Sequence, residues 1–242
     1  MRRRAIWGAG LLVLAVVGLG ASQLQSSDML GHVVALCATS EAHLQVPLPC
    51  SDVRRIGNGA GAYIVKVPFT SKHPIAVPFG EIDGLEIPDF AGQTAADAVS
   101  IAWNARDVLS AGGKTPRWDE AGLAINSFAK RTQDRLHLHI DCLDRSVRSF
   151  IADHPGEVGE GWEPYPPDRR LWWRRAAAAE VLADPVAAWH KGLPPTLERP
   201  LRLNLGLAGA PPLDGEAQFV LFASTAVSVE RILDQTCRVQ AP

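Results

Sequence analysis

The sequence has no excess of one charge sign, no internal repeat and no Cys-x-x-Cys pair. Lys and Arg number 24 against 26 Asp and Glu, so the formal net charge is −2. This balance gives no reason to expect a nucleic-acid partner. The missing Cys-x-x-Cys argues against a zinc ribbon or a redox motif. A chain of 242 residues, 47% of them hydrophobic, suits one large domain or one domain with an elaboration.

Charge is also missing from residues 5–21, which follow the cationic start Met-Arg-Arg-Arg and precede a polar run. Positive residues before an apolar segment keep that end in the cytoplasm and send the rest across the membrane. The segment is longer than a usual signal-peptide core and close to the ~20 residues that span a bilayer. We expect residues 1–27 to be a single transmembrane signal-anchor, with a cleaved signal peptide as the alternative, and the remainder to be exported.

Export gives the cysteines a structural meaning. There are four, Cys37, Cys50, Cys142 and Cys237, and an even number in an oxidising compartment suggests two disulfides with three possible pairings. Cys37 and Cys50 are close enough in the sequence to close a small loop. That pairing would leave Cys142 to bond with Cys237.

Hydrophobic periodicity predicts an α+β fold. In chain order we expect a short helix, two strands joined by a tight turn, a long helix and two more strands, at residues 28–36, 62–67, 73–79, 94–110, 121–126 and 136–143. This order predicts an antiparallel sheet with a helix covering one face. Further on we expect a helix over 169–182, a strand over 218–224 and a short helix or turn over 229–235. We assign 28–150 to a catalytic core and 151–242 to a C-terminal extension packed on it.

The strand around residue 138 carries the most informative side chains. With the strand period of two, one face is apolar and the other polar. The apolar face holds Leu136, Leu138, Ile140 and Cys142, and the polar face holds Arg135, His137, His139 and Asp141. A strand that buries one side and aligns two histidines and a carboxylate on the other is a candidate reaction site. A solvated polar face is the plainer interpretation.

Four separated features resemble the histidine-triad superfamily of nucleotide hydrolases and transferases, and within it the bacterial CDP-diacylglycerol diphosphatases. His73-Pro-Ile-Ala-Val-Pro78 resembles the strand His-x-apolar-apolar-apolar-Pro. Asn126 stands seven residues before Gln133, and Gln133 four before His137, as in the pattern Asn…Gly-Gln…His-x-His-x-His. The Arg-Thr-Gln lead-in at 131–133, the segment Trp-Asn-Ala-Arg at 103–106 and the single anchor are typical of the diphosphatase branch. The resemblance implies a histidine-triad-like (HIT-like) fold with a family-specific extension.

The resemblance also implies roles for individual residues. His139 matches the middle histidine, which is the nucleophile, and His137 matches the first, which supports it. Asp141 stands where most of the superfamily has a third histidine, and the diphosphatase branch shares this departure. If the frame slid by two residues, His137 would be the nucleophile instead, but the spacings from Asn126 and Gln133 argue against that.

The implied activity is hydrolysis of CDP-diacylglycerol to CMP and phosphatidate in phospholipid metabolism. His139 would attack the phosphorus next to cytidine, and water would then hydrolyse the nucleotidyl-histidine. The main demand is charge stabilisation on the phosphoryl oxygens. The candidate donors are Asn126, Thr132, Gln133, the loop backbone and Lys66. No metal or cofactor is required in this scheme.

Other groups near this segment have weaker assignments. Lys130 and Arg131 either add positive charge at the site or are solvated loop cations. We expect His73 to be a buried strand residue behind the site.

Two alternatives remain open. His137, His139 and Asp141 could ligate zinc or iron with a third residue such as His73 or His154, since His-x-His is a common ligand spacing. The chain could also be an envelope lipid- or nucleotide-binding protein without turnover.

A cluster of Trp and Arg over 169–175 suits the anionic headgroup region of a membrane; core-capping tryptophans with solvated arginines are the alternative. We expect a protein of the inner membrane facing the periplasm, with membrane lipids and the liponucleotide as its partners.

Overall fold

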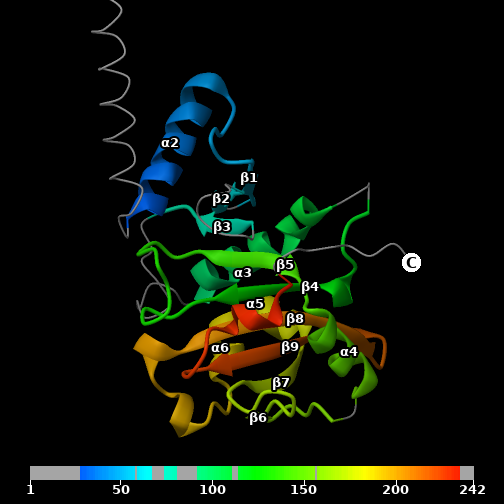
Figure 1. Cartoon of the computed structure of the whole chain (residues 1–242). Coiled ribbons are helices and arrows are strands. Elements are labelled where there is room, and N and C mark those ends of the chain that lie inside the picture. The colour runs from blue at the N-terminus through cyan, green and yellow to red at the C-terminus, as the bar shows by residue number, and fades with distance from the viewer. Residues whose placement is uncertain are drawn as a thin grey trace, which may run out of the picture.

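A computed structural model describes residues 28–57, 59–66, 74–80, 92–110, 114–155 and 157–234. Within this part of the chain a nine-stranded sheet runs through the whole molecule (Figure 1). Every neighbouring pair of strands is antiparallel. The order across the sheet is β1-β2-β3-β5-β4-β8-β9-β7-β6.

The strands are β1 (Asp52–Arg55), β2 (Gly61–Val65), β3 (Ile75–Pro78), β4 (Ala121–Ile125), β5 (Leu138–Cys142), β6 (Glu163–Pro164), β7 (Trp172–Ala177), β8 (Asn204–Leu213) and β9 (Glu216–Ser224). The α-helices are α2 (Met29–Leu44), α3 (Gly92–Asn104), α4 (Arg145–Asp153), α5 (Ala178–Ala183) and α6 (Pro185–His190). Short 3₁₀ helices are η1 (Ala105–Leu109), η2 (Trp118–Glu120), η3 (Pro195–Leu197), η4 (Pro200–Arg202) and η5 (Val229–Ile232).

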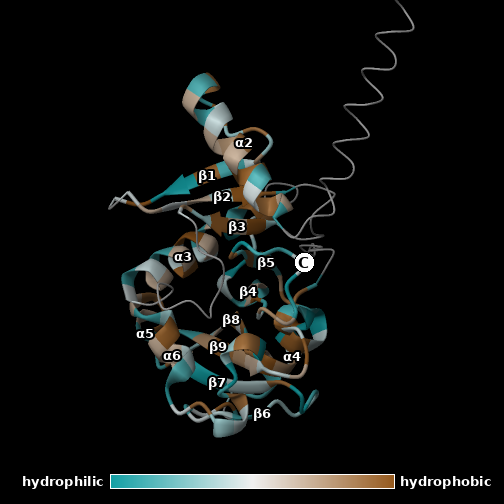
Figure 2. Ribbon diagram, turned by 90° about the vertical axis from the view of Figure 1, so that its left-hand side faces the viewer, coloured by the Kyte–Doolittle hydropathy of each residue, from teal (hydrophilic) through white to brown (hydrophobic). Residues whose placement is uncertain are grey.

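Helices cover the sheet on both faces (Figure 2). Helices α3, α5 and α6 lie on one face and share the largest apolar core with the inward side chains of β4 and β5. Helix α4 and η5 lie on the opposite face, over a second core that includes β8 and β9. Helix α2 packs at the β1–β3 end over a third, smaller cluster. The sheet is therefore buried on both sides along most of its width.

The predicted α+β class is confirmed, and so is the arrangement of the first half of the chain. The strands expected at 62–67 and 73–79 form the pair β2–β3, and those at 121–126 and 136–143 form β4–β5. Helix α3 covers these strands as expected. The strand predicted over 218–224 is β9, and the predicted short helix or turn near 229 is η5.

The helix predicted over 169–182 is wrong in its first half. Residues 172–177 form strand β7, which pairs with β9 along its whole length, and the helix α5 begins only at Ala178. Trp173, Arg174 and Arg175 are buried in this strand, with 1%, 1% and 4% of their surface exposed. Neither interpretation of the Trp and Arg cluster holds for Arg174 and Arg175, which are buried in the sheet, whereas Arg169 and Arg170 are exposed. Pairing with β9 therefore outweighs the helical preference of the alanines that follow.

Other boundaries also differ. Helix α2 continues eight residues beyond the predicted end at Leu36, and α3 gives way to η1 at Ala105. Strand β8 has no counterpart among the predictions, because its glycines and prolines hide the strand pattern. This strand pairs with β4 and so joins the segment after residue 150 to the same sheet. The boundary proposed at 150 stays a prediction.

The disulfide predicted between Cys37 and Cys50 is present, with the two Cα atoms 5.7 Å apart. Cys142 is also disulfide-bonded, but Cys237 lies outside the described residues, so that pairing stays a prediction. The same holds for the anchor at residues 1–27. Among the helices that are described, none has the length and apolar character needed to cross a membrane.

Candidate active site

Strand β5 has an apolar face and a polar face, as predicted. Leu138 and Ile140 point into the large core under α3, while His139 and Asp141 point to the opposite face. His139 lies between Ile75 of β3 and Ala124 of β4 in the sheet register. Its surface is only 5% exposed, so the solvated-face interpretation is wrong. The imidazole is held in a largely dry environment.

His137 lies just before β5 and supports the ring of His139. The two ring centroids are 4.9 Å apart, in an edge-to-face arrangement. His137 Nδ1 lies 2.8 Å from the carbonyl oxygen of Arg135. A carbonyl only accepts, so Nδ1 carries the hydrogen and donates it. This hydrogen bond fixes the tautomer and the plane of the ring.

Burial lowers the pKa of His137 from its usual value of 6.5. The hydrogen bond to the carbonyl of Arg135 and the carboxylate of Glu230 raise it, and the positive charge of Arg131 lowers it. Burial is the largest of these effects, so His137 is neutral at physiological pH. A neutral ring beside His139 does not repel a proton or a positive charge that forms there.

Glu230, in η5, is the residue of this site that the sequence did not indicate. Its Oε1 lies 3.2 Å from Nε2 of His139. The side-chain amide of Asn126 donates a hydrogen bond to the same oxygen. The hydroxyl of Ser228 donates to Oδ1 of Asn126 at 2.8 Å and accepts from the backbone N–H of Glu230 at 3.1 Å. The four side chains form one connected polar group that links β5, the end of β4 and η5.

Small residues on the sheet make room for η5 above His139. Ala124 stands next to His139 in the register, and Gly206 of β8 stands next to Ala124. A Cβ atom at Gly206 would clash with Val229 and would press on Ile232, both of which are fully buried. The missing side chain therefore lets η5 approach the sheet, and that approach sets the position of Glu230.

Two more of the predicted phosphate donors, Thr132 and Gln133, lie in the loop between β4 and β5. The Gln133 side chain accepts a hydrogen bond from the backbone N–H of Leu30 at 2.8 Å, in the first turn of α2. Ser127 donates its N–H to the side chain of Asn204 at 3.0 Å, which anchors the start of the loop to β8. Thr132 is exposed. Gln133 and Ser127 thus hold the loop in place.

Asp141 is almost fully buried, with 1% of its surface exposed, and its carboxylate accepts from the N–H of Cys142 at 2.7 Å. Lys66 follows β2 and is exposed. Within the described ranges, neither Lys66 nor Thr132 contacts the histidines. The structure thus gathers His137, His139 and Asn126 and leaves Lys66 and Thr132 at the surface.

An open hollow of about 380 Å³ adjoins the polar group and is lined by Lys130, Ala226, Val227, Ser228, Glu230 and Arg231. Lys130 and Arg231 are the cations of this lining, and Arg231 also forms an ion pair of 3.0 Å with Asp168. Arg131 lies over the ring of Phe128, 5.0 Å from its centroid. A hollow lined by two cations, and joined to the buried imidazole through Glu230, suits an anionic ligand.

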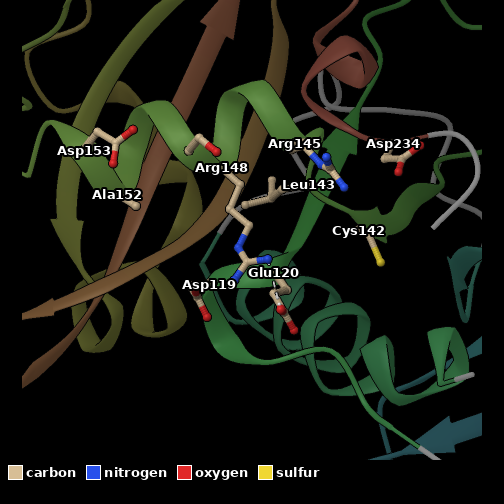
Figure 3. A pocket seen from close by; sticks show the side chains of 10 residues that line it. Asp119, Glu120, Cys142, Leu143, Arg145, Arg148, Ala152, Asp153 and Asp234 are labelled. Atoms are coloured by element: carbon tan, nitrogen blue, oxygen red, sulfur yellow. Dashed lines mark hydrogen bonds and ion pairs between the residues drawn. The ribbon is translucent and has the colours of Figure 1, made fainter. Parts of the chain in front are cut away.

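A second pocket, of about 350 Å³, lies beside α4 and η2 and is drawn in Figure 3. Its lining is mainly charged, and Arg148 bridges Asp119 and Glu120 at 3.2 and 3.0 Å. Cys142 is the member of β5 that reaches it. The predicted catalytic and phosphate-binding residues do not line this pocket, although it borders strand β5 through Cys142. We therefore do not assign the reaction to it.

The positions of the predicted metal ligands bear on the alternative of a zinc or iron site. Across the described ranges, no three His, Cys, Asp or Glu side chains are grouped closely enough to ligate one ion. His154 stacks on Phe150 in α4, with ring centroids 4.1 Å apart, and its Nδ1 lies 2.9 Å from the Phe150 carbonyl oxygen. His73, the other candidate third ligand, lies outside the described residues. The described donors do not assemble the predicted ligand set.

A buried imidazole, a supporting imidazole and cations at an open rim define a candidate phosphoryl- or nucleotidyl-transfer site. Residues 25–241 match the model of a protein family described as CDP-diacylglycerol pyrophosphatase. The chain belongs to this family of phosphoanhydride hydrolases, as the sequence predicted.

One relative matches the chain over almost its full length. The CDP-diacylglycerol pyrophosphatase of Yersinia pestis is 28% identical, over 99% of this chain and 97% of that protein. The match thus includes the C-terminal segment that carries Glu230, as well as the histidine strand.

Proposed function

We propose that the protein hydrolyses the pyrophosphate bond of CDP-diacylglycerol, releasing CMP and phosphatidate through a nucleotidyl-histidine at His139. The observation that carries this proposal is the contact of His139 Nε2 with Glu230 at the edge of a cation-rimmed hollow. This contact supports Nε2 as the reacting nitrogen, because Glu230 joins it to the lining of the hollow. Membership in the family supplies the substrate class.

In the first half-reaction, the neutral ring of His139, with its hydrogen on Nδ1, attacks the phosphorus next to cytidine through Nε2, and phosphatidate leaves. Phosphatidate is a good leaving group, so this step needs orientation and charge stabilisation more than proton donation. The His137 ring packs edge-to-face on His139 and keeps it aligned. The spacings from Asn126 and Gln133 favour His139 over His137 as the nucleophile, and the contact of His139 Nε2 with Glu230 supports the same choice.

Charge that develops on the phosphoryl oxygens needs donors in the same place. The side-chain amide of Asn126 donates a hydrogen bond to Glu230 Oε1, the oxygen that lies beside His139 Nε2. Lys130 lines the hollow. Arg131 is close enough to lower the pKa of His137. These three side chains are the candidate phosphate contacts that the structure supports best, with Thr132, Gln133 and Lys66 as more distant candidates.

The proposal includes a histidine-triad-like core and an anchor at residues 1–27 in the inner membrane, with the catalytic part in the periplasm. The disulfide between Cys37 and Cys50 supports an oxidising compartment. The cationic start followed by an apolar stretch supports the orientation. A tether to the bilayer would keep the enzyme near a diacyl substrate that does not leave it.

Hydrolysis of CDP-diacylglycerol in detergent micelles containing EDTA tests the proposal. Wild type is expected to release CMP, His139→Ala to lose about 10³-fold or more in rate, and His137→Ala to lose less. His190→Ala removes an exposed histidine and is the matched control. If EDTA abolishes wild-type activity, the metal-dependent alternative replaces this mechanism; if no CMP appears, a binding protein without turnover or a hydrolase of another nucleotide replaces it.

A further inference from the structure

We propose that Glu230 is the general base of the second half-reaction, in which it takes a proton from the water that hydrolyses the nucleotidyl-histidine. This inference rests on the proposed function, because it needs the covalent intermediate on His139. It assigns a catalytic role to a side chain from the C-terminal segment, about ninety residues after the histidine strand.

The position of the carboxylate is the first argument. Oε1 of Glu230 lies 3.2 Å from His139 Nε2, on the side from which phosphorus must approach that nitrogen. Once phosphorus is bonded to Nε2, the phosphoryl group must push the carboxylate outward. Attack on phosphorus is roughly in line with the bond that breaks, so water arrives on the side of phosphorus away from Nε2. The displaced carboxylate then lies beside the water.

The second argument is that Glu230 can move while its backbone stays fixed. Its side chain is 26% exposed and lines the hollow, whereas the side chains of Val229 and Ile232 are fully buried in the core beneath η5. The hydroxyl of Ser228 caps the start of η5. A rotation of the Glu230 side chain into the hollow therefore leaves the 3₁₀ turn in place.

The third argument comes from the chemistry of the two half-reactions. The first expels phosphatidate and needs no strong acid, but the second needs a nucleophile made from water. A base must lie within hydrogen-bond reach of that water. Asp141 is 1% exposed and bound to the N–H of Cys142, and His137 is bound to the carbonyl of Arg135. Among the residues that the structure describes, Glu230 is the carboxylate that both contacts His139 and opens onto the hollow.

The step balances without a further reactant. The water oxygen forms a bond to phosphorus, the P–Nε2 bond breaks, and its electron pair returns to the imidazole. One water proton moves to the Glu230 carboxylate and the other stays on the new phosphate oxygen of CMP. Glu230 then releases its proton to solvent, and both side chains regain their starting charge.

Glu230→Gln tests the role, because it keeps the shape and removes the base. Pre-steady-state experiments, with substrate in excess over enzyme, would use CDP-diacylglycerol labelled on the phosphate next to cytidine, stopped in alkaline detergent because phosphoramidates are acid-labile. We expect a burst of phosphatidate equal to the enzyme, at close to the wild-type rate, with CMP release slowed about 10²–10⁴-fold. The label should remain on the protein. Glu216→Gln, at an exposed position, is the matched control and should behave as wild type.

Glu230→Ala with added formate supplies a second readout that a structural role would not move. Formate should restore CMP release in this variant without changing the phosphatidate burst. The inference is overturned if Glu230→Gln slows the burst and CMP release equally, or if no label accumulates while wild type does label. If wild type and all variants release CMP without any label or burst, the proposed covalent mechanism has failed, whatever Glu230 does.

Discussion

Two neighbouring halves of the sheet contribute to the site in different ways. The half with β3, β5 and β4 carries the imidazoles, and its alternating pattern is visible in the sequence. The half with β8, β9 and η5 carries Glu230 and Ser228, and its backbone approaches the histidines through Gly206. The comparison teaches that the nucleophile is local to one strand, whereas its polar surroundings depend on contacts across about a hundred residues of sequence.

The largest effect on stability is expected from the disulfide at the β1–β3 end, far from η5. Replacing Cys37 and Cys50 by Ser frees a loop of 13 residues and should lower the free energy of unfolding by about 3 kcal/mol. Urea denaturation measures it. In native conditions the rate of CMP release should stay near wild type. A large loss of turnover in the folded double variant would mean that the two ends are coupled.

Gly206→Ala directly tests the half with β8, β9 and η5. The new methyl group would clash with Val229 and displace η5 with Glu230, and a displacement of about 1 Å can cost roughly 10²-fold in rate. The effect should fall on CMP release in single-turnover experiments. Gly161→Ala is the control, since a Cβ there meets nothing. Unchanged turnover in Gly206→Ala would contradict the role given to the approach of η5.

Ser228→Ala should have a smaller effect. It removes the cap of η5 and the hydrogen bond to Asn126, which together should lower the free energy of unfolding by about 1 kcal/mol. Thermal denaturation checks the stability and steady-state kinetics the turnover. Ser228→Thr keeps a hydroxyl and should restore most of both. If Ser228→Ala lowers neither, the polar group around Glu230 is not a functional unit.

The smallest expected effect is the contribution of His137 to the pH dependence of the free energy of unfolding. Burial holds the pKa of His137 in the folded protein below its usual 6.5, so the unfolded chain binds a proton more readily. The contribution of His137 to the free energy of unfolding is fully present above pH 6.5 and is lost as the pH falls towards the lower, folded-state pKa. Urea midpoints between about pH 7.5 and 5.5 should therefore fall more steeply for wild type than for His137→Gln. Equal slopes would contradict a buried, neutral His137.

The sequence predicted the first half of the fold because its patterns are local. The alternation around His139 follows directly from the strand period, and the loop Cys37–Cys50 closes over few residues. Strand β7 was predicted as a helix because nothing local shows that buried arginines pair with β9. Strand β8 was missed because Gly206 and its other glycines serve packing and carry no strand signal.

The candidate site divides in the same way. His137, His139 and Asn126 could be predicted, since their spacing lies within one strand pair. Glu230 could not, because its contact with His139 depends on the fold of β8, β9 and η5. The one local signal was the short helix expected near residue 229, which placed an acidic residue in a turn but not beside an imidazole.

The most direct test of the account is to locate the covalent intermediate. Wild type and Glu230→Gln would be mixed with CDP-diacylglycerol, stopped in alkaline detergent and digested, and the peptide around β5 would be sequenced by mass spectrometry. The account predicts a cytidylyl group on His139, accumulating in Glu230→Gln and short-lived in wild type. A cytidylyl group on His137, or full turnover with no labelled peptide in either protein, would contradict it.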